Sequence, residues 1–283
     1  MKKFLVTFLL LVSSITLLAA CGNSDNESKG NTDSTENKEV ESDKTSDTSN
    51  DLLASIQEKG ELVIGTEGVY PPFTYHDDSG ELTGFDVDIS TEIAKRLGVK
   101  PVYLETQWDA MFAGLDSKRF DMIANQVGIN EERLEKYDFT NPYNVSVGVV
   151  VAHEDNNDIT SYEDIKGLKS AQTMTSNHRN IAESYGAEIV GVEGFVQSVE
   201  LINSGRVDVT VNDKLSVLDF LKQRPDASVK IVATYDDALD IGLMFRQGDE
   251  TLVEAVNKAL SDMIEDGTHL EISEKWFGED VLK

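Results

Sequence analysis

Residues 62–65 read LVIG, residues 85–98 read FDVDISTEIAKRLG, and residues 101–104 read PVYL. The first and last runs are short and apolar, which is typical of strands buried in a sheet. In the middle run apolar side chains recur at helical spacing. Gly98 follows them at the C-terminal end of the predicted helix, where a residue with a left-handed backbone conformation is favoured. The three runs therefore predict a strand, a helix and a second strand, the repeating unit of an α/β fold.

The same alternation continues along the chain. Further helices are predicted at residues 108–115, 195–202, 215–221 and 250–267, a helix start at 161–164, and strands at 169–172 and 207–213. Phe120, Met122 and Ala124 recur at every second position, which predicts a strand that ends at the polar residues Asn125 and Gln126. Residues 115–122 can also be aligned with residues 201–209. If that short match is real, the chain holds two related α/β halves.

The N-terminal region differs in composition from the rest of the chain. Residues 4–20 form an apolar run behind a basic start, and they are followed by Cys21, the single cysteine. Because a membrane span needs about 20 apolar residues, residues 1–20 are predicted to be a signal peptide. One thiol excludes an internal disulfide. Residues 21–50 are acidic and polar, with Val40 as the apolar exception, and predict a disordered tether.

Charge and histidine spacing restrict the possible functions. The formal net charge of -27 argues against nucleic acid, which is bound by clustered Lys and Arg, and against electrostatic binding to anionic lipid. The histidines His76, His153, His178 and His269 are dispersed without metal-ligand spacing, and each is expected to be solvated. No serine lies in a nucleophile-elbow motif. We therefore expect no metal, no cofactor and no catalytic residues.

Several motifs follow one another over more than 200 residues. They are Thr66–Tyr75, Leu82–Asp88, Asn125–Arg133, Tyr137–Phe139, Pro142–Tyr143 and Glu274–Gly278. In order and spacing they resemble the family 3 bacterial extracellular solute-binding proteins, which bind amino acids, from about Leu52 to the C-terminus. Within that family the chain resembles the cystine-binding branch most, through residues 66–68, 106–109 and 125–127.

The resemblance implies a two-lobed α/β fold of the periplasmic-binding-protein type (type II), with two hinge strands and the ligand in the interlobe cleft. Lobe 1 would comprise residues 51–143 and 241–283, and lobe 2 residues 144–240. The protein would act as a monomer that captures a polar amino acid, preferably L-cystine, and delivers it to the transmembrane subunits of an ABC permease. Residues 18–21, LAAC, resemble a lipobox. Cys21 would then carry a lipid that anchors the protein on the outer face of the cell membrane.

Two charged residues are the central binding candidates. A zwitterionic ligand needs one cationic and one anionic partner, and a guanidinium pairs well with a carboxylate. Arg133 matches the family's carboxylate-binding arginine, and Asp213 matches its acceptor for the ligand ammonium. The alternatives are a surface ion pair of Arg133 with Glu131 or Glu135, and a helix-capping role for Asp213.

Three further side chains are expected around the rest of the ligand. By resemblance, Tyr70 and Trp108 are apolar walls that enclose the ligand side chain, with simple core packing as the alternative. Glu67 is a candidate for specificity, because cystine carries a second ammonium that a carboxylate would recognise. Glu67 could equally meet a lysine-like side chain or a water molecule.

The remaining predicted contacts lie at two polar turns. They are Asn125, Gln126, Gly128, Thr175, Ser176 and Asn177. Gln126 and Asp213 end two predicted strands, where ligands of open α/β sheets bind, so we expect them to face each other across the cleft. Gly128 stands where family members often carry serine, so a backbone amide would replace a hydroxyl. Residues 175–177 precede a helix whose free amides could add to carboxylate recognition, with capping alone as the alternative.

Two other functions remain open at this point. A surface-anchored protein of this kind could be an amino-acid sensor that signals to a partner, or it could bind another polar amino acid. Some relatives on the same lobes are enzymes, so the fold alone does not exclude catalysis. A sensor would bind its ligand but leave uptake intact when deleted, whereas an enzyme would convert the ligand.

Overall fold

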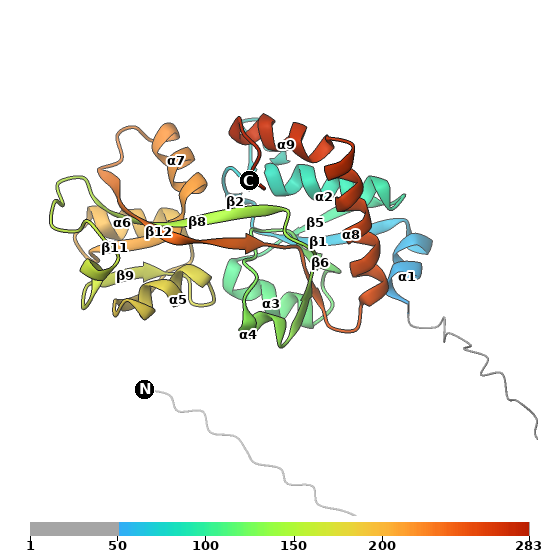
Figure 1. Cartoon of the computed structure of the whole chain (residues 1–283), viewed down its shortest axis with the longest axis horizontal. Helices are drawn as coiled ribbons and strands as arrows, with labels where there is room; N and C mark the ends of the chain where they lie inside the picture. Colours follow the sequence, from blue (N-terminus) through green and yellow to red (C-terminus); the bar gives the residue numbers. More distant parts are fainter. Residues whose placement is uncertain (1–50, 283) are drawn as a thin grey trace, which may run out of the picture. The chain divides into compact units, whose positions relative to one another are not determined.

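The computed structural model describes residues 51–282, drawn in colour in Figure 1. The predicted signal peptide, the predicted lipid site at Cys21 and the predicted tether lie outside these residues. The helices are α1 (Leu52–Lys59), α2 (Phe85–Arg96), α3 (Trp108–Asp116), α4 (Glu131–Leu134), the 3-10 helix η2 (Glu163–Ile165), α5 (Asn177–Ser184), α6 (Phe195–Asn203), α7 (Lys214–Gln223), α8 (Glu250–Glu265) and α9 (Thr268–Phe277). None of these helices is long and apolar enough to cross a membrane.

The strands form two five-stranded sheets and one small sheet. They are β1 (Glu61–Thr66), β2 (Val69–Tyr70), β3 (Thr74–His76), β4 (Leu82–Thr83), β5 (Lys100–Glu105), β6 (Met122–Ile123), β7 (Tyr137–Phe139), β8 (Asn144–His153), β9 (Lys169–Gln172), β10 (Glu188–Gly191), β11 (Val209–Asp213), β12 (Val229–Ile241) and β13 (Met244–Arg246). The first sheet has the order β5-β1-β6-β13-β7, the second β10-β9-β11-β8-β12, and the small sheet β2-β3-β4. We call the elements of the first and small sheets lobe 1 and those of the second sheet lobe 2.

Each lobe follows the strand and helix alternation expected from the sequence. In lobe 1, β1 runs parallel to β5 and β6, and α2 connects the strands, as the first three runs of the sequence predict. In lobe 2, β9 runs parallel to β10 and β11, with α5 and α6 as the connections. Since the carboxyl ends of parallel strands meet at one edge of a sheet, each lobe presents its polar turns together.

The two lobes are linked by a long antiparallel pair. Strands β8 and β12 pair from Val229 opposite His153 to Ile241 opposite Asn144, with two irregularities in register. Figure 1 shows them side by side, running from the second sheet toward the first. These are the two strands expected to form the hinge. The exact residues that separate the lobes, 143/144 and 240/241, stay a prediction.

The two lobes share one local structure, the junction from helix to strand after α3 and after α6. Lys118 and Gly205 both have left-handed backbone angles there, φ 60° and 66°. Asp121 then accepts a hydrogen bond from a backbone amide of β1 at 2.9 Å, and Asp208 accepts one from β9 at 2.8 Å. The short internal match seen in the sequence therefore corresponds to equivalent structure in the two halves.

Two local features differ from the sequence pattern. Strand β6 forms where the alternation predicts a strand, but it covers only Met122 and Ile123. Met122, Ile123 and Ala124 are all buried, because β6 lies between β1 and β13 in the middle of the sheet. The helix start at residues 161–164 yields only the three-residue η2. Asp164 accepts from the backbone amides of Thr160 and Ser161 as a capping residue does, but no apolar helical spacing follows, and Gly167 has a left-handed φ of 74°.

Each lobe has its own hydrophobic core. In lobe 1, the buried side chains of β1 and α2 pack with α8, and α3 forms a second cluster with β6. In lobe 2, the two faces of the sheet carry separate clusters, one against α5 and one against α6 and α7. Because the burial of apolar surface dominates folding, each sheet is held together largely without the other lobe.

Candidate ligand cleft

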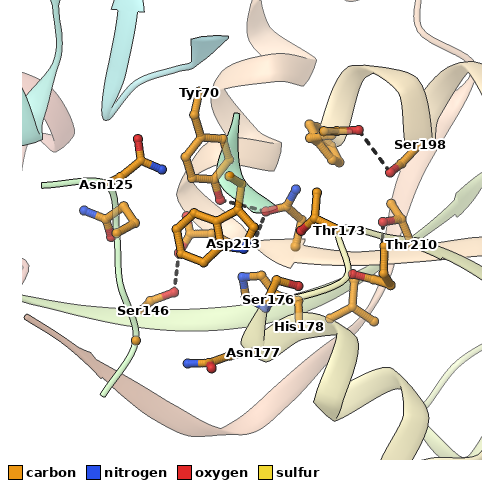
Figure 2. Close-up of a pocket in the computed structure, with 18 of the residues that line it drawn as sticks. Tyr70, Asn125, Ser146, Thr173, Ser176, Asn177, His178, Ser198, Thr210 and Asp213 are labelled. Carbon is orange, nitrogen blue, oxygen red and sulfur yellow. Dashed lines mark hydrogen bonds between the residues drawn. The ribbon is translucent and has the colours of Figure 1, made fainter. Parts of the chain in front are cut away.

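A cavity lies between the two lobes, and Figure 2 shows residues from both of them around it. Its empty space is about 710 Å³, including the mouth that opens to solvent. Ten of the eleven predicted contact residues line it: Glu67, Tyr70, Trp108, Asn125, Gln126, Gly128, Arg133, Ser176, Asn177 and Asp213. Thr175 does not line it. The structure thus brings these ten positions together, and their contact with a ligand stays a prediction.

Arg133 is buried at the side of the cavity, with only 7% of its surface exposed. Its guanidinium donates to two backbone carbonyls, to Gly128 of lobe 1 at 2.7 Å and to Thr175 of lobe 2 at 2.8 Å. No carboxylate of residues 51–282 forms an ion pair with it. Burial lowers the pKa of Arg133 to about 10, so it remains charged at neutral pH. The surface ion pair considered as an alternative is not formed.

The guanidinium of Arg133 lies over two aromatic rings. Its central carbon is 5.6 Å from the centre of the Trp108 ring and 5.2 Å from that of Phe112. Such contacts restrict a guanidinium to one orientation and leave its edge for hydrogen bonds. Trp108 is therefore both a wall of the cavity and a support for Arg133. Its own indole Nε1 is buried and has no hydrogen-bond partner within residues 51–282.

Asp213 ends strand β11 and is 2% exposed. Its carboxylate caps α7 by accepting from the backbone amide of Ser216 at 2.9 Å, and it also accepts from the hydroxyl of Ser146. Burial raises the pKa of Asp213 above its ordinary value, because no cation compensates the lost hydration. The capping role is therefore present, and the same carboxylate lines the cavity, where an ammonium would restore its charge balance.

Glu67 follows strand β1 and is fixed by Asn125. The Asn125 amide donates to the Glu67 carboxylate at 2.7 Å, and the Asn125 carbonyl oxygen accepts from the Glu67 backbone amide at 2.8 Å. Burial raises the pKa of Glu67 to about 7, and the nearby charge of Asp109 acts in the same direction. The side chain of Asn125 therefore forms hydrogen bonds with Glu67. The carboxylate of Glu67 lines the cavity without a cationic partner in the described part of the chain.

Gln126 lines the cavity, but its polar atoms are hydrogen-bonded to protein groups of lobe 1 and of strand β8. Its backbone amide and side-chain amide donate to Asp86 at 2.8 and 2.7 Å, and its side-chain oxygen accepts from Asn144 at 2.7 Å. Its backbone has the left-handed φ of 51°. The direct ligand hydrogen bond expected of the Gln126 side chain would require one of these bonds to break. Burial raises the pKa of Asp86 to about 7, and this buried carboxylate was missed in the sequence.

Gly128 is opposite Asn177 of lobe 2. A Cβ atom on Gly128 would lie 2.0 Å from the Asn177 side-chain nitrogen, so this amide occupies the space that a serine side chain would need. The Asn177 oxygen accepts from Asn130 of lobe 1 at 2.7 Å, which leaves the nitrogen at the cavity side. The side-chain amide of Asn177 is therefore a candidate replacement for the hydroxyl that the sequence lacks.

Ser176 and Thr175, which precede Asn177 in the chain, have roles that differ from that of Asn177. Ser176 caps α5, since its hydroxyl accepts from the backbone amide of Arg179 at 3.0 Å. Thr175 points away from the cavity: its backbone amide and its hydroxyl both donate to Asp109 of lobe 1, at 3.0 and 2.7 Å. Thr175 therefore joins the lobes beside the cavity, which only the tertiary structure could reveal.

The far side of the cavity also carries contacts between the lobes. The Tyr70 hydroxyl donates to the side chain of Asn212 at 2.7 Å, and the Ser216 hydroxyl donates to the backbone carbonyl of Pro71 at 3.0 Å. Gln107 and Glu193 form a further contact at 2.9 Å. With contacts on both sides, the lobes are held together over the cavity.

Several lining residues were not predicted from the sequence. They are Ser146, Ala171, Gln172, Thr173, His178, Gly194, Phe195, Ser198, Thr210, Val211, Asn212, Leu239 and Ile241. His178 was expected to be solvated, but its Nδ1 is buried, and burial together with the charge of Arg133 lowers its pKa to about 4. Its place directly after the predicted contact Asn177 was the one signal available. Within residues 51–282, no group of acidic, histidine or cysteine side chains could hold a metal ion.

Comparison with known proteins places these features in a family. The family model described as "Bacterial extracellular solute-binding proteins, family 3" matches residues 62–279. The "L-cystine-binding protein TcyA" of Bacillus subtilis is 51% identical, with 100% of each chain covered. Relatives of this kind support a binding role for the family rather than catalysis.

Two solved structures extend the comparison. "An ancestral arginine-binding protein bound to glutamine" is 37% identical with a TM-score of 0.75, covering 78% of this chain and 99% of that one. The "L-cystine solute receptor of Neisseria gonorrhoeae in the unliganded open conformation" is 46% identical with a TM-score of 0.55, covering 81% and 98%. The fold is therefore the two-lobed α/β fold that the sequence predicted. The chain belongs to the bacterial extracellular solute-binding proteins of family 3.

Proposed function

We propose that this protein is the substrate-binding lipoprotein of an amino-acid ABC importer, with L-cystine as its preferred ligand. The observation that carries the proposal is the charge arrangement of the cavity: buried Arg133 has no carboxylate partner within residues 51–282, while Asp213 and Glu67 face the same cavity with raised pKa values. An amino acid supplies the carboxylate for Arg133 and the ammonium for Asp213.

A second ammonium on the ligand explains Glu67. An ordinary neutral amino acid would leave this carboxylate unpaired in a desolvated cavity, which is costly. Cystine carries two ammonium and two carboxylate groups, so its distal ammonium would pair with Glu67. The names of relatives support the same choice, since TcyA and the gonococcal receptor are described as proteins for L-cystine. Arginine also carries a second cation and is the competing ligand.

The contacts between the lobes support a hinged mechanism. The fold is more similar to a ligand-bound relative than to an open relative of higher sequence identity, with TM-scores of 0.75 and 0.55. Contacts of Arg133 and Tyr70 across the cavity support the same closed arrangement. Closure about β8 and β12 around the ligand would then create the surface that the permease recognises.

The anchor is proposed from the sequence alone. A signal peptide over residues 1–20 and a lipid on Cys21 would place the protein on the outer face of the cell membrane, with residues 22–50 as the tether. One acyl chain binds membranes weakly and two bind them stably. Because the strongly acidic chain gains nothing from anionic lipid, the covalent lipid would supply the attachment.

A thermal-shift screen of the purified protein against amino acids tests the binding proposal. At a concentration of about 100 times its Kd, a ligand that binds only the native state adds about 2.7 kcal/mol to the free energy of unfolding. L-cystine should raise the melting temperature more than arginine, glutamine or histidine. If no amino acid raises it, the proposed function is wrong.

Uptake separates transport from sensing. Deletion of the gene should abolish high-affinity uptake of labelled cystine, and expression of the intact protein should restore it. Normal uptake in the deletion strain, together with cystine binding by the purified protein, would instead indicate the sensor. Conversion of cystine by the purified protein would indicate an enzyme.

A further inference from the structure

Among the buried polar atoms of lobe 2 that have no hydrogen-bond partner within residues 51–282, two lie beside the same residue of β8. One is Nδ1 of His178, in the first turn of α5, and the other is the hydroxyl of Tyr162, beside η2. Tyr162 is 4% exposed. Since nearly all buried polar groups in proteins are hydrogen-bonded, to protein or to ordered water, two unpaired atoms near each other require an explanation.

Both atoms face the same glycine of the hinge strand β8. A Cβ atom on Gly148 would lie 3.3 Å from the Tyr162 hydroxyl and 3.6 Å from the His178 Nδ1, with the Cβ of Tyr235 on β12 at 3.6 Å. Both polar atoms therefore border the space beside Gly148 that no side chain fills. A water molecule cannot sit at the Cβ position itself, which is one bond length from the Cα atom. A water farther out, between the two polar atoms, would hydrogen-bond to both. Gly148 is also the residue paired with Asp213 across the sheet.

The surroundings hold Tyr162 in place. Its ring packs against Tyr185 and Tyr235, with ring centres 5.1 and 5.3 Å apart. Aromatic pairs at these distances are favourable and restrict the side-chain rotamer. Because Tyr235 belongs to β12, the hydroxyl of Tyr162 is fixed relative to both hinge strands.

The ionic state of His178 follows from the same environment. Burial and the positive charge of Arg133 lower its pKa to about 4, so the ring is neutral at physiological pH and carries one N–H. Which ring nitrogen carries the hydrogen depends on the partner of the other nitrogen. The position near Arg133 also places His178 at the carboxylate end of the proposed ligand.

We propose that a buried water at Gly148 accepts from the Tyr162 hydroxyl and donates to His178 Nδ1, so that His178 presents Nε2–H to the ligand carboxylate beside Arg133. His178 then becomes a specificity residue of the cleft, and Tyr162 a positioning residue that acts through it. This inference rests on the proposed function for the identity of the ligand group. The tautomer itself can be measured on the free protein and does not depend on it.

The first test is the tautomer. Long-range proton–nitrogen NMR spectra of the full-length protein, in detergent, report which nitrogen of each histidine carries the hydrogen. The wild type should show His178 as the neutral Nε2–H form between pH 5.5 and 8. Tyr162→Phe and Gly148→Ala, which remove the hydroxyl or fill the water position, should change that pattern. Tyr185→Phe, a hydroxyl deletion in the same aromatic cluster, is the control and should not.

The second test is affinity, measured by titration calorimetry with L-cystine. His178→Phe removes the N–H donor and should weaken binding by about 10- to 100-fold, as expected for a hydrogen bond to a charged group, and Tyr162→Phe by about 3- to 10-fold. Tyr185→Phe should bind like the wild type. A wild-type Nδ1–H tautomer, or a tautomer that Tyr162→Phe leaves unchanged, would overturn the water bridge.

The two proposals fail in different ways. If the wild type binds cystine and His178→Phe binds it equally well, the ligand contact of His178 is refuted while the transport function stands. If the wild type binds no amino acid, both the proposed function and the ligand contact are refuted, and the NMR spectra still decide the water bridge.

Discussion

Replacing Glu67 by Gln should change how stability depends on pH. The substitution keeps the shape of the side chain and removes its charge. In the folded protein burial raises the pKa of Glu67 from 4.5 to about 7. The native state therefore holds this proton to a higher pH than the unfolded chain does. Between pH 4.5 and 7 the unfolded chain binds fewer protons, so the free energy of unfolding falls as the pH rises.

The magnitude follows from the two pKa values. A rise in the pKa of Glu67 from 4.5 to about 7 lowers the free energy of unfolding by about 3 kcal/mol at pH 8, and by less than about 1 kcal/mol at pH 5. The Glu67→Gln variant would avoid this penalty, and its new side chain could still accept from Asn125. It would lose the second acceptor oxygen, which receives the backbone amide of Trp108, at a cost of about 1 kcal/mol. The expected net gain at pH 8 is about 2 kcal/mol.

Urea denaturation of the ligand-free proteins at pH 5, 6, 7 and 8 measures this difference. Wild type and Glu67→Gln should be about equally stable at pH 5, and the variant should be more stable at pH 8. Asp86, whose pKa is also raised to about 7, is present in both proteins and cancels in the comparison. Parallel stability profiles for the two proteins would show that Glu67 is not a desolvated carboxylate, and the argument for a distal ammonium would lose its basis.

Three further substitutions test separate parts of the account. Cys21→Ala should move the protein from the membrane fraction to the medium without changing its melting temperature, and an unchanged membrane fraction would argue against lipidation. Gly128→Ala should weaken cystine binding about tenfold in calorimetry, because its Cβ would meet the Asn177 amide at 2.0 Å, and Asn177→Ala in the same protein should restore part of the loss. Tyr70→Phe removes the 2.7 Å hydrogen bond to Asn212 and should weaken binding about fivefold by destabilising the closed form; unchanged affinity would exclude that role.

The elements of the fold followed from local patterns where those patterns were strong. The spacing of apolar residues predicted α2 and β11 almost to their ends, because a helix or strand with one clear periodicity needs little tertiary information. Strand β6 was harder, since a central strand buried on both faces does not alternate. The η2 segment shows that a capping pattern starts a long helix only when apolar spacing follows it.

The residues of the site also differ in how far the sequence alone could identify them. Arg133 and Asp213 could be found from sequence because each carries a charge at a motif position, and charge restricts the possible roles. The sequence could not show that Gln126 donates to Asp86 or that Thr175 donates to Asp109, because these hydrogen bonds depend on how distant segments approach each other. His178 was missed for the same reason: a histidine after a helix cap reads as exposed, and only the packing around Gly148 and Arg133 makes it part of the cleft.

Titration calorimetry of L-cystine into the purified protein and into Arg133→Met, in buffer without reductant, tests the central claim most directly. The wild type should bind one cystine per chain. The variant removes the buried cation, leaves the ligand carboxylate unpaired, and should lose about 2 to 5 kcal/mol of binding free energy. Circular dichroism should confirm that the variant is folded. Wild-type affinity in a folded Arg133→Met protein, or no cystine binding by the wild type, would contradict the account.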